Sequence, residues 1–217
     1  RSDEEIDGAI YSADDLIITG TGTLTVDASF ADGIVGKDDL SIESGTITVT
    51  SEDDGIRGKD SLSISGGTIT IDAVADALKA TNDTDAGSGI ILISGGDIAI
   101  TAGDDGVQAE QQVSITGGTV DIAQSVEGIE APVVVIDDGT ISINASDDGI
   151  NASASTFVTS GLSVTINGGD ISITMASGDT DAIDSNGDLT ITGGTIDITA
   201  QSPFDFDGTG TLSGGTI

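Results

Sequence analysis

Hydrophobic and polar residues alternate along most of the chain, and the alternation is centred on a recurring pair of glycines. Residues 61–71 read SLSISGGTITI, and near-copies stand at 112–122 (QVSITGGTVDI) and 188–198 (DLTITGGTIDI). Strict alternation over four to eight residues is typical of β-strands with one buried face. Each copy therefore predicts two short strands joined by a turn at the glycines.

The same unit recurs at a nearly fixed period. The second glycine of each copy, or its equivalent, is found at Gly45, Gly67, Gly96, Gly118, Gly139, Gly169, Gly194 and Gly215. A third apolar column precedes these strands, at Ile34, Ile56, Leu78, Val107, Ile129, Ile150 and Ile183. The glycine spacing indicates a unit of about 22 residues with three insertions, and a period in this range is the signature of a solenoid.

Three short strands per repeat predict an all-β fold, a right-handed parallel β-helix of about nine rungs. Identical side chains then stack about 4.8 Å apart, so that the aliphatic columns form a continuous core. No linker divides the rungs, and residues 1–217 are expected to form a single domain. No polar cap follows Leu212 and Ile217, so we expect the domain to continue beyond the C-terminus or to stack end to end on a copy of itself.

Composition excludes several kinds of chemistry. The chain has no cysteine and no histidine, which excludes disulfides, thiolate zinc sites and imidazole bases. Its formal net charge of −33 argues against nucleic acid as a partner, and no stretch of 18 uncharged apolar residues predicts membrane insertion. Of the 38 acidic residues, 31 are aspartate, the shorter side chain that calcium-binding loops favour.

The acidic residues recur in register with the strands. One precedes each apolar residue of the third column, and Asp7 has the same place in the first rung; the acids are Asp7, Asp32, Asp54, Asp76, Asp105, Glu127, Asp148 and Asp181. Three are doubled, as DDG at 53–55, 104–106 and 147–149, where we expect the glycine to permit a sharp bend. Oxygen ligands without nitrogen or sulfur suit calcium. The alternative is a solvated acidic edge that keeps the solenoid soluble.

The calcium hypothesis has a defined set of candidate ligands. It adds Glu130, Asn151 and Asp184, which follow the turn at outward positions. The candidates are Asp53, Asp54, Asp76, Asp104, Asp105, Glu127, Glu130, Asp147, Asp148, Asn151, Asp181 and Asp184. Several calcium ions are expected.

Apart from Arg1, the basic residues Lys37, Arg57, Lys59 and Lys79 fall within three consecutive rungs. They either compensate the neighbouring acidic residues or bind a carboxylate-bearing ligand such as a uronic-acid polymer. The insertions at 81–89 and 153–161 leave from the same strand and are expected to wall a groove.

Four motifs resemble a family of bacterial carbohydrate-binding domain proteins. They are SVEGIEAP (125–132), SDDGINAS (146–153), DAIDSNGDLTITGGT (181–195) and PFDFDGTGTLSGGTI (203–217). The resemblance implies a calcium-loaded, cell-surface, right-handed β-helix, similar to pectate lyases, that binds cellulose and acidic sugars. It also implies calcium at the acidic turns. The chain departs from it in having no tryptophan to stack on crystalline cellulose.

The expected function is a calcium-binding extracellular module that binds or adheres to acidic polysaccharide or another plant cell-wall glycan. No catalytic residues are assigned. Two alternatives remain: a structural solenoid of a cell-surface filament, and a calcium-dependent polysaccharide lyase. A lyase needs a base, for which Arg57, Lys59 and Lys79 are the candidates.

Overall fold

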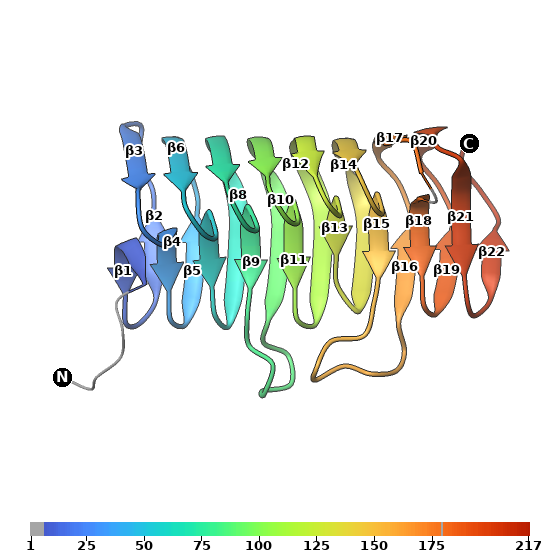
Figure 1. Ribbon diagram of the computed structural model, residues 1–217, viewed down its shortest axis with the longest axis horizontal. Coiled ribbons are helices and arrows are strands. Elements are labelled where there is room, and N and C mark those ends of the chain that lie inside the picture. Colours follow the sequence, from blue (N-terminus) through green and yellow to red (C-terminus); the bar gives the residue numbers. More distant parts are fainter. Residues whose placement is uncertain (1–6, 179) are drawn as a thin grey trace.

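A computed structural model describes residues 7–178 and 180–217. The chain winds into a solenoid of nine turns whose strands pair in parallel from one turn to the next (Figure 1). Each turn contributes one strand to the first sheet. In order, these strands are β1 (Gly8–Ser12), β4 (Asp32–Gly36), β7 (Ile56–Gly58), β9 (Leu78–Ala80), β11 (Val107–Ala109), β13 (Ile129–Glu130), β15 (Ile150–Ala152), β18 (Asp181–Ser185) and β21 (Ser202–Phe206).

The remaining strands form a second sheet that bends at the glycine pairs. Strands before the bend are β2 (Leu16–Ile18), β5 (Asp39–Ile42), β16 (Ser163–Ile166), β19 (Asp188–Ile191) and β22 (Gly210–Leu212). Strands after it are β3 (Thr23–Ala28), β6 (Thr46–Ser51), β17 (Asp170–Met175) and β20 (Thr195–Thr199). In four central turns one long strand passes through the bend: β8 (Ser61–Ala73), β10 (Ile90–Ala102), β12 (Gln112–Ser125) and β14 (Val133–Ala145). The sequence predicted two strands in each of these places.

The glycines at the bend are required by backbone geometry. The second glycine of each pair has a positive φ, for example 101° at Gly67 and 92° at Gly118. A side chain there is disfavoured by the backbone conformation and also lacks space, because a Cβ on Gly118 would lie 2.9 Å from the carbonyl carbon of Gly95 on the preceding turn. The glycines therefore stack directly on one another from turn to turn.

The predicted apolar columns form one continuous core. Strand pairing aligns like with like, as in Ile93↔Ile115 and Ile100↔Ile122. The central residues of all columns are fully buried, and they belong to one cluster that extends from Val26 to Ile196. The predicted parallel β-helix with about nine rungs is confirmed.

The glycines of the DDG turns have a different role from the predicted one. Gly55, Gly106 and Gly149 do not have positive φ. They are needed because the next turn lies too close for a side chain: a Cβ on Gly55 would lie 2.6 Å from the carbonyl oxygen of Ala77, and one on Gly106 2.6 Å from that of Gly128. Close packing against the next turn, and not the bend, selects glycine here.

Two long connections leave the solenoid at the same corner, between β9 and β10 and between β15 and β16 (Figure 1). They correspond to the predicted insertions. Within the described ranges 7–178 and 180–217, no helix is long and apolar enough to cross a membrane.

Candidate functional site

In the first eight of the nine turns, one acidic residue lies at the entrance to the first sheet, and these residues form a row that we call the acidic ladder. Its members are Asp7, Asp32, Asp54, Asp76, Asp105, Glu127, Asp148 and Asp181. The backbone holds the row in register, since the amide of Gly33 donates to the carbonyl of Asp54 and that of Gly106 to the carbonyl of Glu127, both at 2.9 Å. Carboxylates are therefore stacked on successive turns.

The ladder side chains also accept hydrogen bonds from the next turn. The amide of Asp105 donates to Oδ1 of Asp76 at 2.9 Å, and that of Glu127 donates to Oδ1 of Asp105 at 3.2 Å. The backbone amides of Asp54, Asp76 and Asp181 donate in the same way to Oδ1 of the ladder aspartate on the preceding turn. One oxygen of most ladder carboxylates is thus committed to the backbone, which leaves the other to interact with neighbouring side chains.

A second row lies beside the ladder, three residues further along each turn. We call it the outward column, and strand pairing aligns its members in the order Arg57, Lys79, Gln108, Glu130, Asn151 and Asp184. Arg57, Lys79 and Glu130 each lie close to the ladder acid of their own turn and to that of the preceding turn. The chemistry of the column therefore decides how each pair of ladder acids is neutralised.

Arg57 neutralises the N-terminal part of the ladder. Its guanidinium donates to Asp32 and, at 2.6 Å, to Asp7, and its Nε lies 3.7 Å from Asp54. The Arg57 side chain is only 14% exposed. Burial opposes ionisation of Asp7, but Arg57 and then Lys37 outweigh it and lower the pKa of Asp7. Protein cations fill the ladder at this end.

Lys79 acts in the same way one turn later. Its Nζ lies 2.5 Å from Asp76 and 3.4 Å from Asp54. Burial disfavours the charged amine, but the hydrogen bond to Asp76 and the charges of Asp76 and Asp54 raise the pKa of Lys79 above its usual value. Asp54 remains under-compensated: its burial, opposed by Lys79, raises its pKa to about 6.

Beyond Lys79 the outward column contains no further cation. The amide Gln108 comes first, and the next position is the acid Glu130. Carboxylate oxygens of Asp105, Glu127 and Glu130 all lie within 4.8 Å of one another. We call these three residues the central acidic cluster. It contains an additional negative charge at the place where earlier turns have a positive one.

The electrostatic consequence is large. Burial, together with the charges of Asp76 and Glu127, raises the pKa of Asp105 to about 9. Burial, reinforced by Glu130, raises the pKa of Glu127 to about 7. Carboxyl groups with such pKa values are protonated or matched by a cation near neutral pH.

Several oxygens next to the cluster have no protein partner. Asn151 donates from Nδ2 to Oε1 of Glu127 at 3.0 Å, but its own Oδ1 is buried and accepts no hydrogen bond. Oε2 of Glu127 and Oε1 of Gln108 are also buried without a partner. Asn151 is 7% exposed. Because buried polar atoms are almost always hydrogen-bonded, these acceptors indicate a missing positive group or donor.

The other predicted ligands are only partly brought together. Asp53 and Asp54 group with Asp32, and Asp104 and Asp105 group with Asp76, each set within 4.8 Å. Among the described residues, Asp147, Asp148, Asp181 and Asp184 do not form such a group. Burial raises the pKa of Asp148 to about 6, with the backbone bond from Asp181 opposing it. A further acidic group, formed by the exposed Asp14 and Asp15 and the half-buried Asp38, was not predicted from the sequence.

The four predicted substrate-binding cations are mostly engaged by the protein itself. Arg57 and Lys79 belong to the ladder, and Lys37 lies 3.3 Å from Asp7 and 5.6 Å from the centre of the Tyr11 ring. Lys59 is the most exposed, at 46%, with Asp60 at 3.9 Å. The geometry favours charge compensation for Arg57 and Lys79 over a ligand contact.

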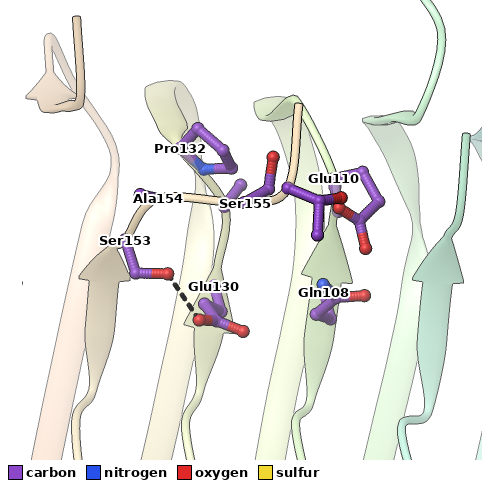
Figure 2. A pocket seen from close by; sticks show the side chains of 10 residues that line it. Gln108, Glu110, Glu130, Pro132, Ser153, Ala154 and Ser155 are labelled. Carbon is purple, nitrogen blue, oxygen red and sulfur yellow. Dashed lines mark hydrogen bonds between the residues drawn. The ribbon is translucent and has the colours of Figure 1, made fainter. Parts of the chain in front are cut away.

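The second insertion forms one wall of a polar groove beside the outward column. Residues 108–110, 130–132 and 153–156 line it, and its free volume is about 130 Å³. Figure 2 shows Ser153 and Glu130 joined by a hydrogen bond, with Gln108 on the neighbouring strand and the segment 153–155 passing across both. The predicted groove had both insertions as walls, but residues 81–89 do not line this one. Its floor is Gln108 and Glu130, and its lining contains none of the predicted cations. The sequence signal for Gln108 was its position three residues after a ladder acid.

The fold and sequence match known proteins. The model of a family described as carbohydrate-binding domain-containing protein matches residues 1–179 and also 124–211. A protein of that description from Acetivibrio thermocellus is 49% identical over 47 residues, which are 22% of this chain and 16% of the relative. The matched segment thus spans a small part of that relative's length.

A solved structure shares the fold along nearly the whole chain. It is that of a polysaccharide lyase-like protein from C. thermocellum, in a gadolinium derivative, with a TM-score of 0.61 and 21% identity over 99% of this chain and 94% of the other. Because the family model covers most of the sequence, the chain belongs to the family of carbohydrate-binding domain-containing proteins.

Proposed function

We propose that this chain is a calcium-stabilised, extracellular polysaccharide-binding module. Calcium binding is supported by the change from a positive to a negative side chain along the outward column. Lys79 lies between Asp54 and Asp76, whereas Glu130 lies with Asp105 and Glu127. Arg57 and Lys79 neutralise the ladder acids on two turns, whereas Glu130 adds a negative charge on a later turn. An external cation would neutralise the ladder acids beside Glu130.

The donor set suits calcium better than other metals. Asp105, Glu127 and Glu130 offer carboxylate oxygens, and Asn151 adds a buried amide oxygen without a partner. Calcium accepts six to eight oxygen ligands in flexible geometry and completes its shell with water, whereas zinc and copper prefer nitrogen or sulfur. Calcium would replace the protons that the raised pKa values of Asp105 and Glu127 imply.

The polysaccharide part is supported by family membership. The family is named for carbohydrate binding, and the fold neighbour is described as polysaccharide lyase-like. Both acidic polysaccharide and cellulose are candidate ligands. Since Arg57 and Lys79 are held by ladder carboxylates, a polyuronate would contact the protein through calcium ions and through Lys59.

A lyase is the second candidate because of the neighbour's description. Elimination from a uronate needs a base near the sugar, and Arg57 is a poor one while its guanidinium donates to Asp7 and Asp32. Incubation with polygalacturonate is therefore expected to give no unsaturated product by ultraviolet absorbance. Steady product formation in calcium that stops with chelator would establish the enzyme.

The calcium proposal is tested by thermal unfolding in calcium, in magnesium, and in sodium at matched ionic strength. A site occupied only in the folded state adds about 2.7 kcal/mol at a hundredfold excess over Kd. We expect calcium to raise Tm most. In the double variant Glu127→Gln with Glu130→Gln the calcium response shrinks, whereas in the control Asp121→Asn with Asp197→Asn it does not. Equal stabilisation by sodium and calcium would show that the ladder is only a screened acidic edge.

A further inference from the structure

We infer that the central acidic cluster controls the position of the second insertion, residues 153–161, and that Ser153 connects the two. The inference rests on the calcium binding proposed above and gives that binding a regulatory consequence. When a cation occupies the cluster, the insertion is held against the solenoid, and without a cation it is released. Ser153 acts as a positioning residue and not as a metal ligand.

The segment that leads into the insertion holds both glutamates of the cluster. Asn151 lies on β15, and its Nδ2 donates to Oε1 of Glu127 at 3.0 Å. Ser153 directly follows this strand, and its hydroxyl donates to Oε1 of Glu130 at 2.6 Å (Figure 2). A movement of the Glu130 carboxylate therefore acts directly on the first residue of the insertion.

Beyond Ser153 the insertion contains a small turn with its own hydrogen bonds. The Ser155 hydroxyl accepts from the amides of Phe157 and Val158 at 3.2 and 3.0 Å. The Ser155 amide donates to the carbonyl of Val158 at 3.0 Å. Because these bonds are internal, the turn keeps its shape when its attachment to the solenoid changes.

Few hydrogen bonds attach this turn to the rest of the protein. Within residues 7–178 and 180–217, such bonds are found at two side chains of the insertion, Ser153 and Thr156. The Thr156 hydroxyl donates to Asp83 of the first insertion at 3.2 Å, but both residues are exposed and water competes for this bond. The bond from Ser153 to the charged Glu130 is therefore the main attachment.

The first insertion, residues 81–89, is attached differently. Asn82 is 1% exposed and donates to Asp60 at 2.7 Å and to Asp85 at 3.2 Å, and its Oδ1 accepts from the amide of Asp85 at 2.9 Å. Gln111 donates to the carbonyl of Asp85 at 2.7 Å. None of these partners belongs to the acidic ladder, so the first insertion is an internal control for the second.

The charges of the cluster decide whether Glu130 stays in place. Oxygens of Asp105, Glu127 and Glu130 lie within 4.8 Å of one another, where carboxylates repel. Asp105 is 8% exposed and accepts the backbone amide of Glu127, whereas Glu130 lines the open groove. Without a cation, we expect Glu130 to turn toward the groove, which breaks or displaces its bond to Ser153.

With a cation in the cluster, the Glu130 carboxylate can serve both partners. It has two oxygens with about four lone-pair positions, so it can face the cation and still accept the Ser153 hydroxyl. The coupling is reciprocal: if calcium favours the Ser153 bond, this bond raises the affinity for calcium by the same factor. A hydrogen bond to a charged group makes that factor about tenfold.

A fluorescent reporter in the insertion tests the coupling. The chain has no tryptophan, so Phe157→Trp places a single fluorophore at a position that is 38% exposed. Its quenching by acrylamide is measured in chelator, in calcium, and in sodium at matched ionic strength. We expect calcium to lower the quenching constant about twofold, because it shifts the insertion to the attached position, and sodium to change it little.

Substitution of Ser153 in the Phe157→Trp background tests the connection itself. In Ser153→Ala we expect the quenching response to disappear and calcium binding at one site to weaken about tenfold by calorimetry, while saturating calcium still raises Tm. Ser153→Thr keeps the hydroxyl and should restore both responses. Ser160→Ala, at an exposed position of the same insertion, is the matched control and should leave both unchanged.

A second reporter separates a local change from a global one. Ala86→Trp places the fluorophore at an exposed position of the first insertion, which Asn82 holds independently of the ladder, and should not respond to calcium. Hydrogen exchange of the unsubstituted protein makes the same comparison without an added tryptophan. Calcium should slow exchange in peptides from 153–161 and leave those from 81–89 unchanged.

Each outcome has a separate meaning. If calcium raises Tm more than sodium does but leaves the quenching of Phe157→Trp unchanged, the inference is overturned while calcium binding stands. A calcium response that persists in Ser153→Ala, or that is equally large in Ala86→Trp, overturns the connection through Ser153. If calcium stabilises no more than sodium and changes no quenching, the proposed calcium site and this inference both fail.

Discussion

Glu130 lies in the outward column at the place that Lys79 occupies two turns earlier, and strand pairing connects the two through Gln108. The same backbone frame therefore presents an ammonium group to one pair of ladder acids and a carboxylate to another. Opposite charges at equivalent positions allow the ladder to be tested by exchanging one for the other.

Glu130→Lys is expected to supply the missing cation from the chain itself. In chelator, the free energy of unfolding should rise by about 1 kcal/mol, because the new ammonium lies beside Asp105 and Glu127. The calcium-dependent part of Tm should shrink at the same time. Asp197→Lys is the control for net charge. A lysine at 130 that lowers Tm in chelator by more than this control would contradict the assignment.

Removing Arg57 is expected to make the N-terminal part of the ladder dependent on calcium. Arg57→Met leaves Asp32 buried without its counter-charge, and breaking a buried ion pair typically costs about 3–5 kcal/mol. Added calcium should restore part of the loss, since the vacated place then resembles the central acidic cluster. Lys59→Met, at an exposed pair, should cost less than about 1 kcal/mol by denaturant unfolding. Similar losses in both variants would show that the ladder does not depend on Arg57.

The metal-free protein is expected to lose stability as the pH rises. The pKa of Asp105 is raised to about 9 and that of Glu127 to about 7, and those of Asp54 and Asp148 to about 6. A folded-state pKa above the unfolded value means that the folded state binds more protons between the two, so stability is full below about pH 4 for these groups and falls toward pH 9.

The measurement is Tm from pH 4 to pH 9, in chelator and in calcium. Calcium competes with the same protons, so its stabilising effect should grow with pH. Glu127→Gln should flatten the metal-free curve near pH 7. A metal-free Tm that climbs steadily over this range would contradict the raised pKa values.

Glycine at the first-sheet turns is expected to be a packing requirement. Gly106→Ala places a Cβ 2.6 Å from the carbonyl oxygen of Gly128 and 2.7 Å from Ile122, and overpacking of this kind costs about 1–3 kcal/mol. The control Gly22→Ala, where a Cβ meets nothing within 4 Å, should change the free energy of unfolding little. Equal changes in the free energy of unfolding for the two variants would mean that chain entropy, and not lack of space for a Cβ, explains the glycine at 106.

Substitutions of buried residues in the core columns are expected to destabilise the fold. Ile115 is fully buried, and Ile115→Ala should cost about 2–5 kcal/mol through lost contacts and the cavity that remains. Ile115→Asp should prevent folding, as should Ile143→Asp, because each buries an unpaired carboxyl. Ile17 is 61% exposed, and Ile17→Ala should be nearly neutral in urea unfolding. A stable Ile115→Asp protein would contradict the observed burial.

The fold was predictable because its signals are local and repeated. Alternation around Gly67 or Gly118 specifies the strands, and the period specifies which side chains stack, as in Ile93↔Ile115. The site was predictable only in part. The sequence showed a ladder carboxylate on eight successive turns, but the pairing of Arg57 with Asp7 depends on side-chain direction across 50 residues.

Two features could not be obtained from spacing alone. The contact between Thr156 and Asp83 depends on how two unrelated insertions fold over the surface. The role of Gly106 depends on the distance to the neighbouring turn, which a residue-by-residue pattern does not contain. The sequence also suggested that the basic residues could bind a ligand, whereas Arg57 and Lys79 form ion pairs with buried aspartates of the ladder.

The stacked glycines at the bend of the second sheet impose a rule on how such a chain can change. From the second turn onward their corner has the same length, because positive φ and direct contact with the preceding turn leave no place for an added side chain. Extra residues enter at other corners, such as the one from which residues 81–89 and 153–161 project. Lengthening or shortening the protein therefore proceeds by whole turns, and each turn adds or removes one position in the charged rows. New ligand specificities arise instead from sequence changes in the loops at a separate edge.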